Sequence, residues 1–316
     1  MNPKKLIHRR ALVRWAIGLA LLILAFVLSG PLPVFSAMGR GLGAFGTLIG
    51  LSAAALAFRA CAWKMALAQE GRKNASLSAA LIALTAVGGI PIRLGVLRKR
   101  TGIPDAAGSI VTDEAVRALA GVIFAVAGLF LGFLLVPGNI LMRGLMLVAA
   151  IGGAVYFLVC TRRRKGFFTA CLAAWPKRFV SPAVRGKMEE RDRFLSKFRA
   201  ENRGAFFTVL FIHLVVLLLF ALQILVVGKT IDAYFPGVLS LGLAALIVLL
   251  RSAFSSLPAA FGVLEAGVAL VLAMTFGVPL AAVGVAAVWV LRLLTLVWWV
   301  VGFAAAGNPV KILLGK

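Results

Sequence analysis

Four ionisable residues interrupt apolar stretches of the chain, and their types indicate that an anion binds there. Arg93 follows one apolar run, Arg251 ends another, and Glu265 and Arg292 are the only charged residues between 252 and 310. Charges at membrane depth are costly, so they usually serve a function. The arginines outnumber the glutamate, and the planar guanidinium group suits phosphate. The four residues therefore predict a binding site for an anionic headgroup.

The same residues allow a second interpretation, in which they serve only the structure. Glu265 and Arg292 would form an ion pair that fixes the packing of two helices. Arg93 and Arg251 would extend their long side chains toward the membrane surface. The sequence alone leaves both interpretations open.

The composition indicates that a bilayer surrounds these charges. Of the 316 residues, 62% are hydrophobic and 14% are charged, whereas soluble domains are about 45–50% apolar and about 25% charged. A net charge of +24 would suggest a nucleic-acid partner in a soluble protein. In this composition it is typical of a membrane protein instead, and we expect no nucleic-acid partner.

Motifs for metal, cofactor or covalent chemistry are absent from the sequence. The three cysteines, Cys61, Cys160 and Cys171, lack the spacing of metal ligands. The chain also has no phosphate-binding loop and no nucleophile elbow. We therefore expect no metal, no cofactor and no catalytic residue. The sequence does not decide whether the chain is an enzyme, and it gives more support to a role that is not enzymatic.

The elements that must position the charges are helices that cross the membrane. Continuous apolar runs near the spanning length of about 20 residues predict an all-α polytopic bundle, and their lack of alternation excludes a barrel. Of the 34 basic residues, 29 fall in segments that can all face the cytoplasm. This charge distribution predicts a multi-pass protein of the bacterial inner membrane with both termini cytoplasmic. The expected full crossings are 15–35, 41–59, 112–136, 140–160, 205–227 and 280–304.

This topology also requires two broken helical hairpins that enter from opposite faces, at 74–92 and 238–276. If their arms span fully, the number of crossings rises to eight or more. The short segments 90–97 and 257–264, one in each hairpin, share Pro, Gly, Val and Leu at matching positions.

Such a match predicts an inverted repeat, with a first copy at about 41–136 and a second at about 205–304. Both copies belong to a single transmembrane domain that covers 1–316.

The matching positions define two helix starts. Pro91 and Pro258 suit the first turn of a helix, where a missing N–H costs nothing. Gly95 and Gly262 follow them at equal spacing. Two helix N-termini, each a natural anion site, would then point into the membrane. In this interpretation Glu265 lies two turns into the helix that begins near Pro258.

Polar residues at 112–117 provide secondary candidates for substrate contact. We expect a helix to open at 112, with Thr112 as its cap and with Asp113 and Glu114 favoured by the positive end of its dipole. Arg117 follows one turn later. His213 stands alone in an apolar helix, where a satisfied packing residue is more common than a base.

The segment 161–204 is the only long polar stretch, with 13 basic and four acidic residues interleaved with aromatic side chains. One interpretation is an interfacial amphipathic helix, or two, bound to the anionic inner leaflet. The other is an ordinary cytoplasmic loop that obeys the positive-inside rule.

Two blocks of the sequence resemble the lysylphosphatidylglycerol synthase transmembrane, or flippase-like, family. The resemblance implies a polytopic bundle, and in bifunctional members of the family this part moves an aminoacylated phospholipid. No soluble stretch here is long enough for an aminoacyl transferase domain. The residues that carry the resemblance are Arg93-Leu94-Gly95, Gly102-Ile103-Pro104 and Ala107–Glu114 in the first block, and Ser256-Leu257-Pro258, Phe261–Glu265, Gly277-Val278-Pro279 and Arg292 in the second.

Together these features predict a transporter that moves a lipid with an anionic headgroup across the inner membrane. Arg93, Arg251 and Arg292 would hold the phosphate, and Glu265 would orient Arg292 or carry a coupling proton. Two alternatives remain. One is a membrane glycosyl- or lipid-modifying transferase that uses Asp113 or Glu114 as its acid. The other is a non-catalytic accessory protein that docks through 161–204.

Overall fold

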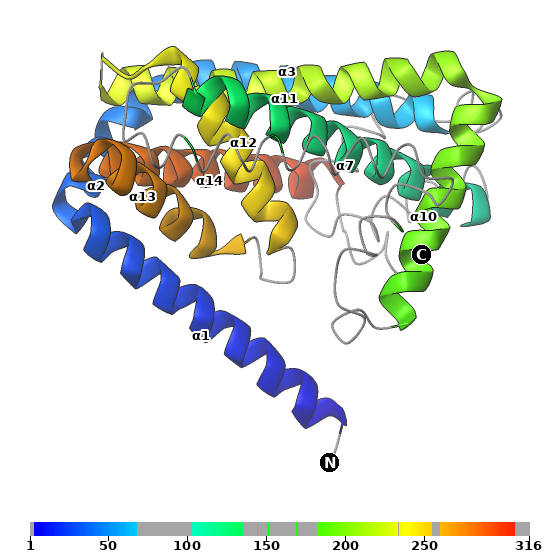
Figure 1. Cartoon of the computed structure of the whole chain (residues 1–316), viewed down its shortest axis with the longest axis horizontal. Coiled ribbons are helices and arrows are strands. Elements are labelled where there is room, and N and C mark those ends of the chain that lie inside the picture. The colour runs from blue at the N-terminus through cyan, green and yellow to red at the C-terminus, as the bar shows by residue number, and fades with distance from the viewer. Residues whose placement is uncertain are drawn as a thin grey trace. The chain divides into compact units, whose positions relative to one another are not determined.

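The computed structural model is helical throughout the part of the chain that it describes (Figure 1). None of these residues forms a strand, which confirms the predicted all-α class. The described residues are 3–67, 103–134, 182–232, 234–254 and 260–306, together with Gly144, Ile151 and Thr169.

The described helices fall into a long and a short group. The long ones are α1 (Pro3–Ser29), α3 (Phe45–Ala66), α7 (Ile103–Leu134), α11 (Arg203–Ile231) and α14 (Val278–Ala306). The short ones are α2 (Pro31–Gly41), α12 (Gly237–Ala253) and α13 (Val263–Phe276), and a 3₁₀ turn, η1 (Leu42–Ala44), joins α2 to α3. The remaining helix, α10 (Pro182–Glu201), is polar.

Five stretches among the described residues are long and apolar enough to cross a membrane, which confirms a polytopic membrane protein. The predicted crossing at 140–160 lies almost entirely outside the described residues, and the first hairpin, 74–92, lies wholly outside them. The second hairpin contains the short apolar helices α12 and α13. The five stretches are Leu12–Ser29, Pro31–Ala66, Ser109–Leu131, Arg203–Ile231 and Val278–Gly302.

The first two crossings differ from their predicted bounds, and a glycine accounts for the end of the first. Gly30 has a φ of 74°, so α1 ends at Ser29 and not at 35. Pro31 then begins α2, in the first turn that proline favours. The chain continues through η1 into α3 and stays helical to Ala66, past the predicted end at 59.

The expected helix start at 112 was wrong. Helix α7 begins at Ile103, and Pro104 falls in its first turn. Thr112, Asp113 and Glu114 therefore lie in the helix interior, beyond the first turn where capping and the helix dipole act. The explanation of these two acids by helix capping does not hold.

The start of α13 also differs from the prediction. This helix begins at Val263, and Gly262, with a φ of 77°, is its N-cap. Ala260 has a φ of 48°, so the backbone at 260–262 is not α-helical. It separates α13 from Pro258, which lies outside the described residues. Glu265 consequently lies in the first turn of α13 and not two turns into a helix.

The chain divides into two compact units, each made of three sequence segments. The first unit is Met1–Leu51, Phe124–Ala150 and Phe220–Leu294, and the second is Ser52–Ile123, Ile151–Leu219 and Thr295–Lys316. In the first unit α13 packs against α1 and α12. Its small-residue core draws on α1, α2, α13 and α14, with Ala25, Val34, Ala266, Ala269, Ala282 and Val285 buried.

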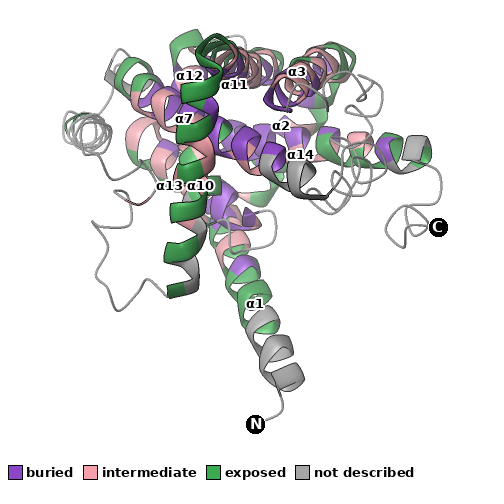
Figure 2. Ribbon diagram, turned by 90° about the vertical axis from the view of Figure 1, so that its right-hand side faces the viewer, coloured by how far each residue is buried: buried purple, intermediate pink, exposed green. Residues whose placement is uncertain are grey.

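In the second unit the core lies among α3, α7, α10 and α11. Helix α10 contributes Phe198 to it, while Met188 and Leu195 pack alongside. Much of the polar remainder of α10 is exposed (Figure 2). The apolar side of this helix is thus at least partly covered by protein. A leaflet contact of the 161–204 segment stays a prediction and, within α10, would use its exposed polar residues.

Candidate functional site

The central feature of the first unit is an ion pair between Glu265 of α13 and Arg292 of α14. Arg292 Nε donates to Glu265 Oε1 at 2.6 Å, and Arg292 Nη2 donates to Glu265 Oε2 at 3.1 Å. Glu265 is 0% exposed and the Arg292 side chain is 15% exposed. Two parallel bonds make this the fork-to-fork geometry in which arginine binds carboxylate and phosphate. The two residues predicted to share a site do meet.

The turn before α13 aims Glu265 at its partner. Gly262 lies so close to α1 that a Cβ built on it would be 1.8 Å from the carbonyl oxygen of Gly18. Its positive φ also disfavours any other residue. Only glycine therefore lets α1 approach the turn this closely. Since α13 starts immediately after the turn, the position of α1 also fixes Glu265.

One aromatic ring lies against the guanidinium group of Arg292, and two further rings pack on that ring. Arg292 Cζ lies 5.6 Å from the centre of the Phe261 ring, a cation–π distance. The Phe261 ring meets Trp289 edge-on at 6.3 Å and Trp15 at 6.1 Å. Arg292 Nη2 also approaches the Ala260 carbonyl oxygen at 3.5 Å. One turn of chain, 260–262, thus contacts α1, α14 and the charged pair together.

The pair is close to electrically neutral, so Arg292 is not one of the arginines that an anion would have to compensate. Glu265 compensates Arg292 directly. Glu265 also lies in the first turn of α13, where the helix dipole favours a negative charge. The interpretation as an ion pair between helices is therefore correct for the state described. Arginine binds phosphate through the same fork that it presents here to the carboxylate.

Arg251 has a different environment. It lies in the last turn of α12, where a cation favours the negative end of the helix dipole. Its side chain is exposed, and its Cζ lies 5.6 Å from the centre of the Phe220 ring. This fits the interpretation in which Arg251 reaches a surface. A shared site with Arg292 stays a prediction, and Pro91, Arg93, Gly95 and Pro258 lie outside the described residues.

The second unit contains a polar pair that sequence reasoning missed. Asp113 of α7 and His213 of α11 meet at 3.1 Å between Oδ1 and Nε2, and both residues are 2% exposed. His213 thus has its partner on another helix, which agrees with the expectation of a satisfied residue. The sequence did carry a signal, since each residue is an isolated ionisable group in a long apolar helix. Glu114 forms an ion pair with Arg117 on its own helix.

Comparison with known protein families agrees with this arrangement of apolar helices and buried charges. The family described as "Lysylphosphatidylglycerol synthase TM region" matches residues 12–304. The chain belongs to this family. No curated protein and no solved structure matches the chain.

Membership of the lysylphosphatidylglycerol synthase TM region family makes the chain a membrane protein with a lipid-related function. The matched region contains both polar pairs, Glu265–Arg292 and Asp113–His213. Within the described part of this family region, no group of three or more His, Cys, Asp or Glu side chains is arranged to hold a metal ion.

Proposed function

We propose that the chain moves a lipid with an anionic headgroup across the bilayer. The observation that carries this proposal is the Glu265–Arg292 pair, which places a buried carboxylate in the first turn of one apolar helix and a mostly buried guanidinium in the interior of another. A lipid phosphate is an anion that shares the geometry of a carboxylate toward arginine. Membership of a lipid-related membrane family adds support.

The proposed binding step is an exchange of partners on Arg292. The headgroup phosphate takes the place of Glu265 on the guanidinium fork. Glu265 then accepts a proton, because an unpaired carboxylate in an apolar site is far costlier than a neutral acid. The charge of the site changes little, so binding and release both remain accessible. Phe261 keeps the guanidinium in place through its ring during the exchange.

Two further arginines extend the site in this proposal. Arg93 and Arg251 draw the headgroup toward Arg292, as the sequence predicts. Discontinuous helices such as α12 and α13 occur at the binding sites of repeat-built transporters, which alternate access by rocking one repeat against the other. The chain uses the same alternation here, in a bacterial inner membrane with both termini cytoplasmic.

The transferase alternative receives less support from the described residues. It requires an acid that is reachable from the cytoplasm. Asp113 is 2% exposed and hydrogen-bonded to His213, while Glu114 is engaged by Arg117. Neither carboxyl group is presented as a free catalytic acid.

Reconstitution tests the proposal. The full chain is placed in phosphatidylcholine vesicles that contain a trace of fluorescent phosphatidylglycerol, and movement of the label between leaflets is followed by reduction of accessible dye. We expect Arg292→Lys and Glu265→Gln to slow the movement at least tenfold, since each removes the exchangeable fork. Arg40→Ala is the matched control, because Arg40 is exposed and bonds to Ser36 on its own helix. Lipid movement at the wild-type rate in both site variants would refute the proposed site.

A further inference from the structure

Trp289 of α14 buries an indole N–H that has no hydrogen-bond partner among the described residues. Three side-chain polar atoms in the described part of the chain are buried in this way, and they belong to Ser29, Trp63 and Trp289. An unpaired buried donor costs free energy, so each such group in a native structure requires an explanation. Because an indole N–H can only donate, the missing partner of Trp289 is a hydrogen-bond acceptor.

Trp289 lies beside the Glu265–Arg292 pair. It precedes Arg292 by three residues, so the two side chains leave α14 on the same face. Both contact one ring, because the centre of the Phe261 ring lies 6.3 Å from that of Trp289 and 5.6 Å from Arg292 Cζ. Trp289 also packs against the small-residue core of the first unit, whose alanines and valines have no side-chain acceptor. The unpaired N–H therefore belongs to the surroundings of the ion pair.

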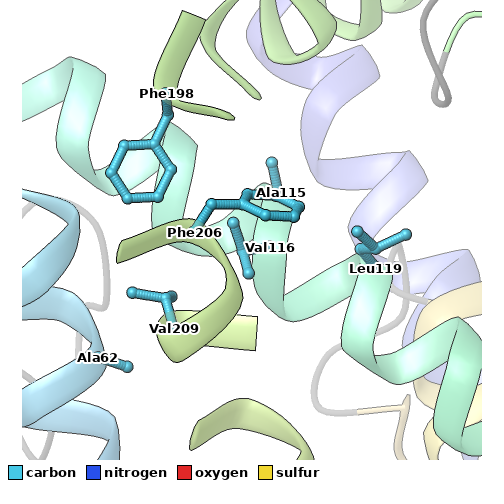
Figure 3. Close-up of a cluster of buried hydrophobic side chains, with 7 residues drawn as sticks. All are labelled: Ala62, Ala115, Val116, Leu119, Phe198, Phe206 and Val209. Atoms are coloured by element: carbon cyan, nitrogen blue, oxygen red, sulfur yellow. The ribbon is translucent and has the colours of Figure 1, made fainter. Parts of the chain in front are cut away.

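A purely structural explanation is that Trp289 serves only through the bulk of its ring. Trp63 of α3, in the second unit, also buries an N–H without a partner among the described residues. Its neighbour Ala62 belongs to the apolar core of that unit (Figure 3), so Trp63 fits a role in packing. Trp289 differs because an arginine with the fork geometry for acids and phosphates lies one turn away. The two tryptophans can therefore be compared directly.

The shape of the anion on Arg292 decides whether the Trp289 N–H finds an acceptor. Glu265 takes the guanidinium fork through two bonds, at 2.6 Å and 3.1 Å, yet its carboxylate does not pair with Trp289. A carboxylate is planar, so its oxygens and their lone pairs lie close to the plane of the fork. A phosphodiester is tetrahedral, so when two of its oxygens take the fork the others project out of that plane. Only a phosphate on Arg292 therefore offers an acceptor outside this plane.

We propose that Trp289 Nε1 donates a hydrogen bond to the headgroup phosphate when this phosphate replaces Glu265 on Arg292. The inference rests on the proposed transport function and deepens it, because it names Trp289 as the residue that favours a phosphate over a carboxylate. The bond exists in one state and not in the other, so it shifts the exchange on Arg292 toward the lipid. Since Nε1 is covered in the state described, the indole turns, or the headgroup enters beside it, as Glu265 leaves.

Two amphiphiles with the same tail length and one negative charge each separate phosphate from carboxylate. The full chain in maltoside micelles is loaded with fluorescent phosphatidylglycerol, and methyl hexadecyl phosphate or hexadecanoate is added until half of the label is displaced. The ratio of the two amounts reports the selectivity, because the affinity for the label cancels in it. Trp289→Phe keeps an aromatic ring but removes the N–H. We expect it to reduce the selectivity for phosphate by about tenfold or more, the effect of losing one bond to a charged group.

Trp63→Phe is the matched control, because it makes the same change to the other tryptophan with an unpaired N–H. It should leave the selectivity at the wild-type value. An equal selectivity in Trp289→Phe and the wild type overturns the inference, since a ring that serves only through its bulk has no preference between the two anions.

A second measurement observes the N–H itself and needs no variant at position 289. The chain has six tryptophans, and ¹⁵N-tryptophan labelling of the full-length protein gives one indole signal for each. Substitution of the other five by Phe, one at a time, assigns the Trp289 signal by elimination. We expect methyl hexadecyl phosphate to move its proton downfield as the hydrogen bond forms, and hexadecanoate to leave it in place. A signal that neither amphiphile moves, or that both move equally, overturns the inference.

The outcomes distinguish this inference from the proposed function. If the wild type does not bind fluorescent phosphatidylglycerol, or if Arg292→Lys binds it as tightly as the wild type, the proposed lipid site is refuted and the inference with it. If Arg292→Lys loses binding while Trp289→Phe keeps the wild-type selectivity, the lipid site stands and the role of Trp289 alone is refuted.

Discussion

The Glu265–Arg292 pair makes a quantitative prediction about stability. Glu265→Gln keeps the size of the side chain but removes the charge, which leaves the guanidinium group, 15% exposed, without its counterion. Two charge-assisted bonds at 2.6 Å and 3.1 Å are weakened. At about 1.5–3 kcal/mol for each bond to a charged group, the loss is about 3–6 kcal/mol. The general figure for breaking a buried ion pair, about 3–5 kcal/mol, lies in the same range.

Removal of both charges costs much less than removal of one. Glu265→Gln/Arg292→Gln leaves two amides that can bond to each other, and no buried charge remains. Replacing a whole buried pair by neutral groups is often close to neutral in stability. We therefore expect the double variant to be more stable than either single variant. The coupling energy in the double-mutant cycle is the amount by which the two single losses together exceed the loss of the double variant, so it should exceed about 3 kcal/mol and favour the pair.

The free energy of unfolding of the four proteins is compared in detergent micelles by denaturant titration, followed by helical circular dichroism. Arg40→Gln serves as the control, because it removes an exposed arginine from α2 and should change stability by less than about 0.5 kcal/mol. Additive losses, with the double variant as unstable as the sum of the singles, would refute the idea that Arg292 depends on Glu265 for its charge compensation.

Three further changes test the packing of the helices. Gly262→Ala should destabilise the protein by more than about 3 kcal/mol, which is the upper cost of backbone strain alone, because at a positive φ its Cβ would also lie 1.8 Å from the Gly18 carbonyl oxygen. In the same thermal unfolding assay the control Gly39→Ala, at an open helical position, should leave the stability unchanged or raise it. Gly128→Ala, whose Cβ would lie 2.8 Å from Ala245 Cβ, should push α7 from α12 and lower the melting temperature, and a melting temperature equal to that of wild type would contradict this packing. Ser52→Ala should lower the free energy of unfolding by about 1–3 kcal/mol, because Trp298 Nε1 donates to Ser52 Oγ at 2.7 Å and would lose this acceptor. An unchanged free energy of unfolding and an unchanged tryptophan emission spectrum would show that this bond contributes nothing.

The fold class and the main ion pair were within reach of the sequence for simple physical reasons. Long apolar runs and the distribution of bases report the bilayer directly. Glu265 and Arg292 were the only charges in a stretch of almost sixty residues, so each was the natural partner of the other. The sequence left undecided whether they bind a ligand or each other, and the structure shows the bond between them.

Helix starts were harder to predict, because they depend on backbone conformations that other segments impose. Proline at 258 indicated a helix start, yet α13 begins at Val263 after the positive φ of Gly262. A Cβ at position 262 would also collide with the carbonyl oxygen of Gly18 on α1, more than 240 residues earlier in the chain, so this contact requires glycine there. Local helix propensity does not predict a contact with such a distant segment. Similarly, Asp113 and Glu114 looked like the first turn of a helix that in fact begins at Ile103.

The Asp113–His213 contact joins two distant segments, so it cannot be predicted from the sequence pattern of either segment alone. The two residues are separated by 100 positions, and each has an adequate local explanation: a capping acid and a packing histidine. The stronger argument is the cost of leaving either one unpaired in an apolar helix, because that cost requires a partner somewhere in the bundle. Asp113 and His213 satisfy this requirement for each other. Each of the two units thus contains a buried ionisable pair that joins two helices, Glu265–Arg292 in the first and Asp113–His213 in the second.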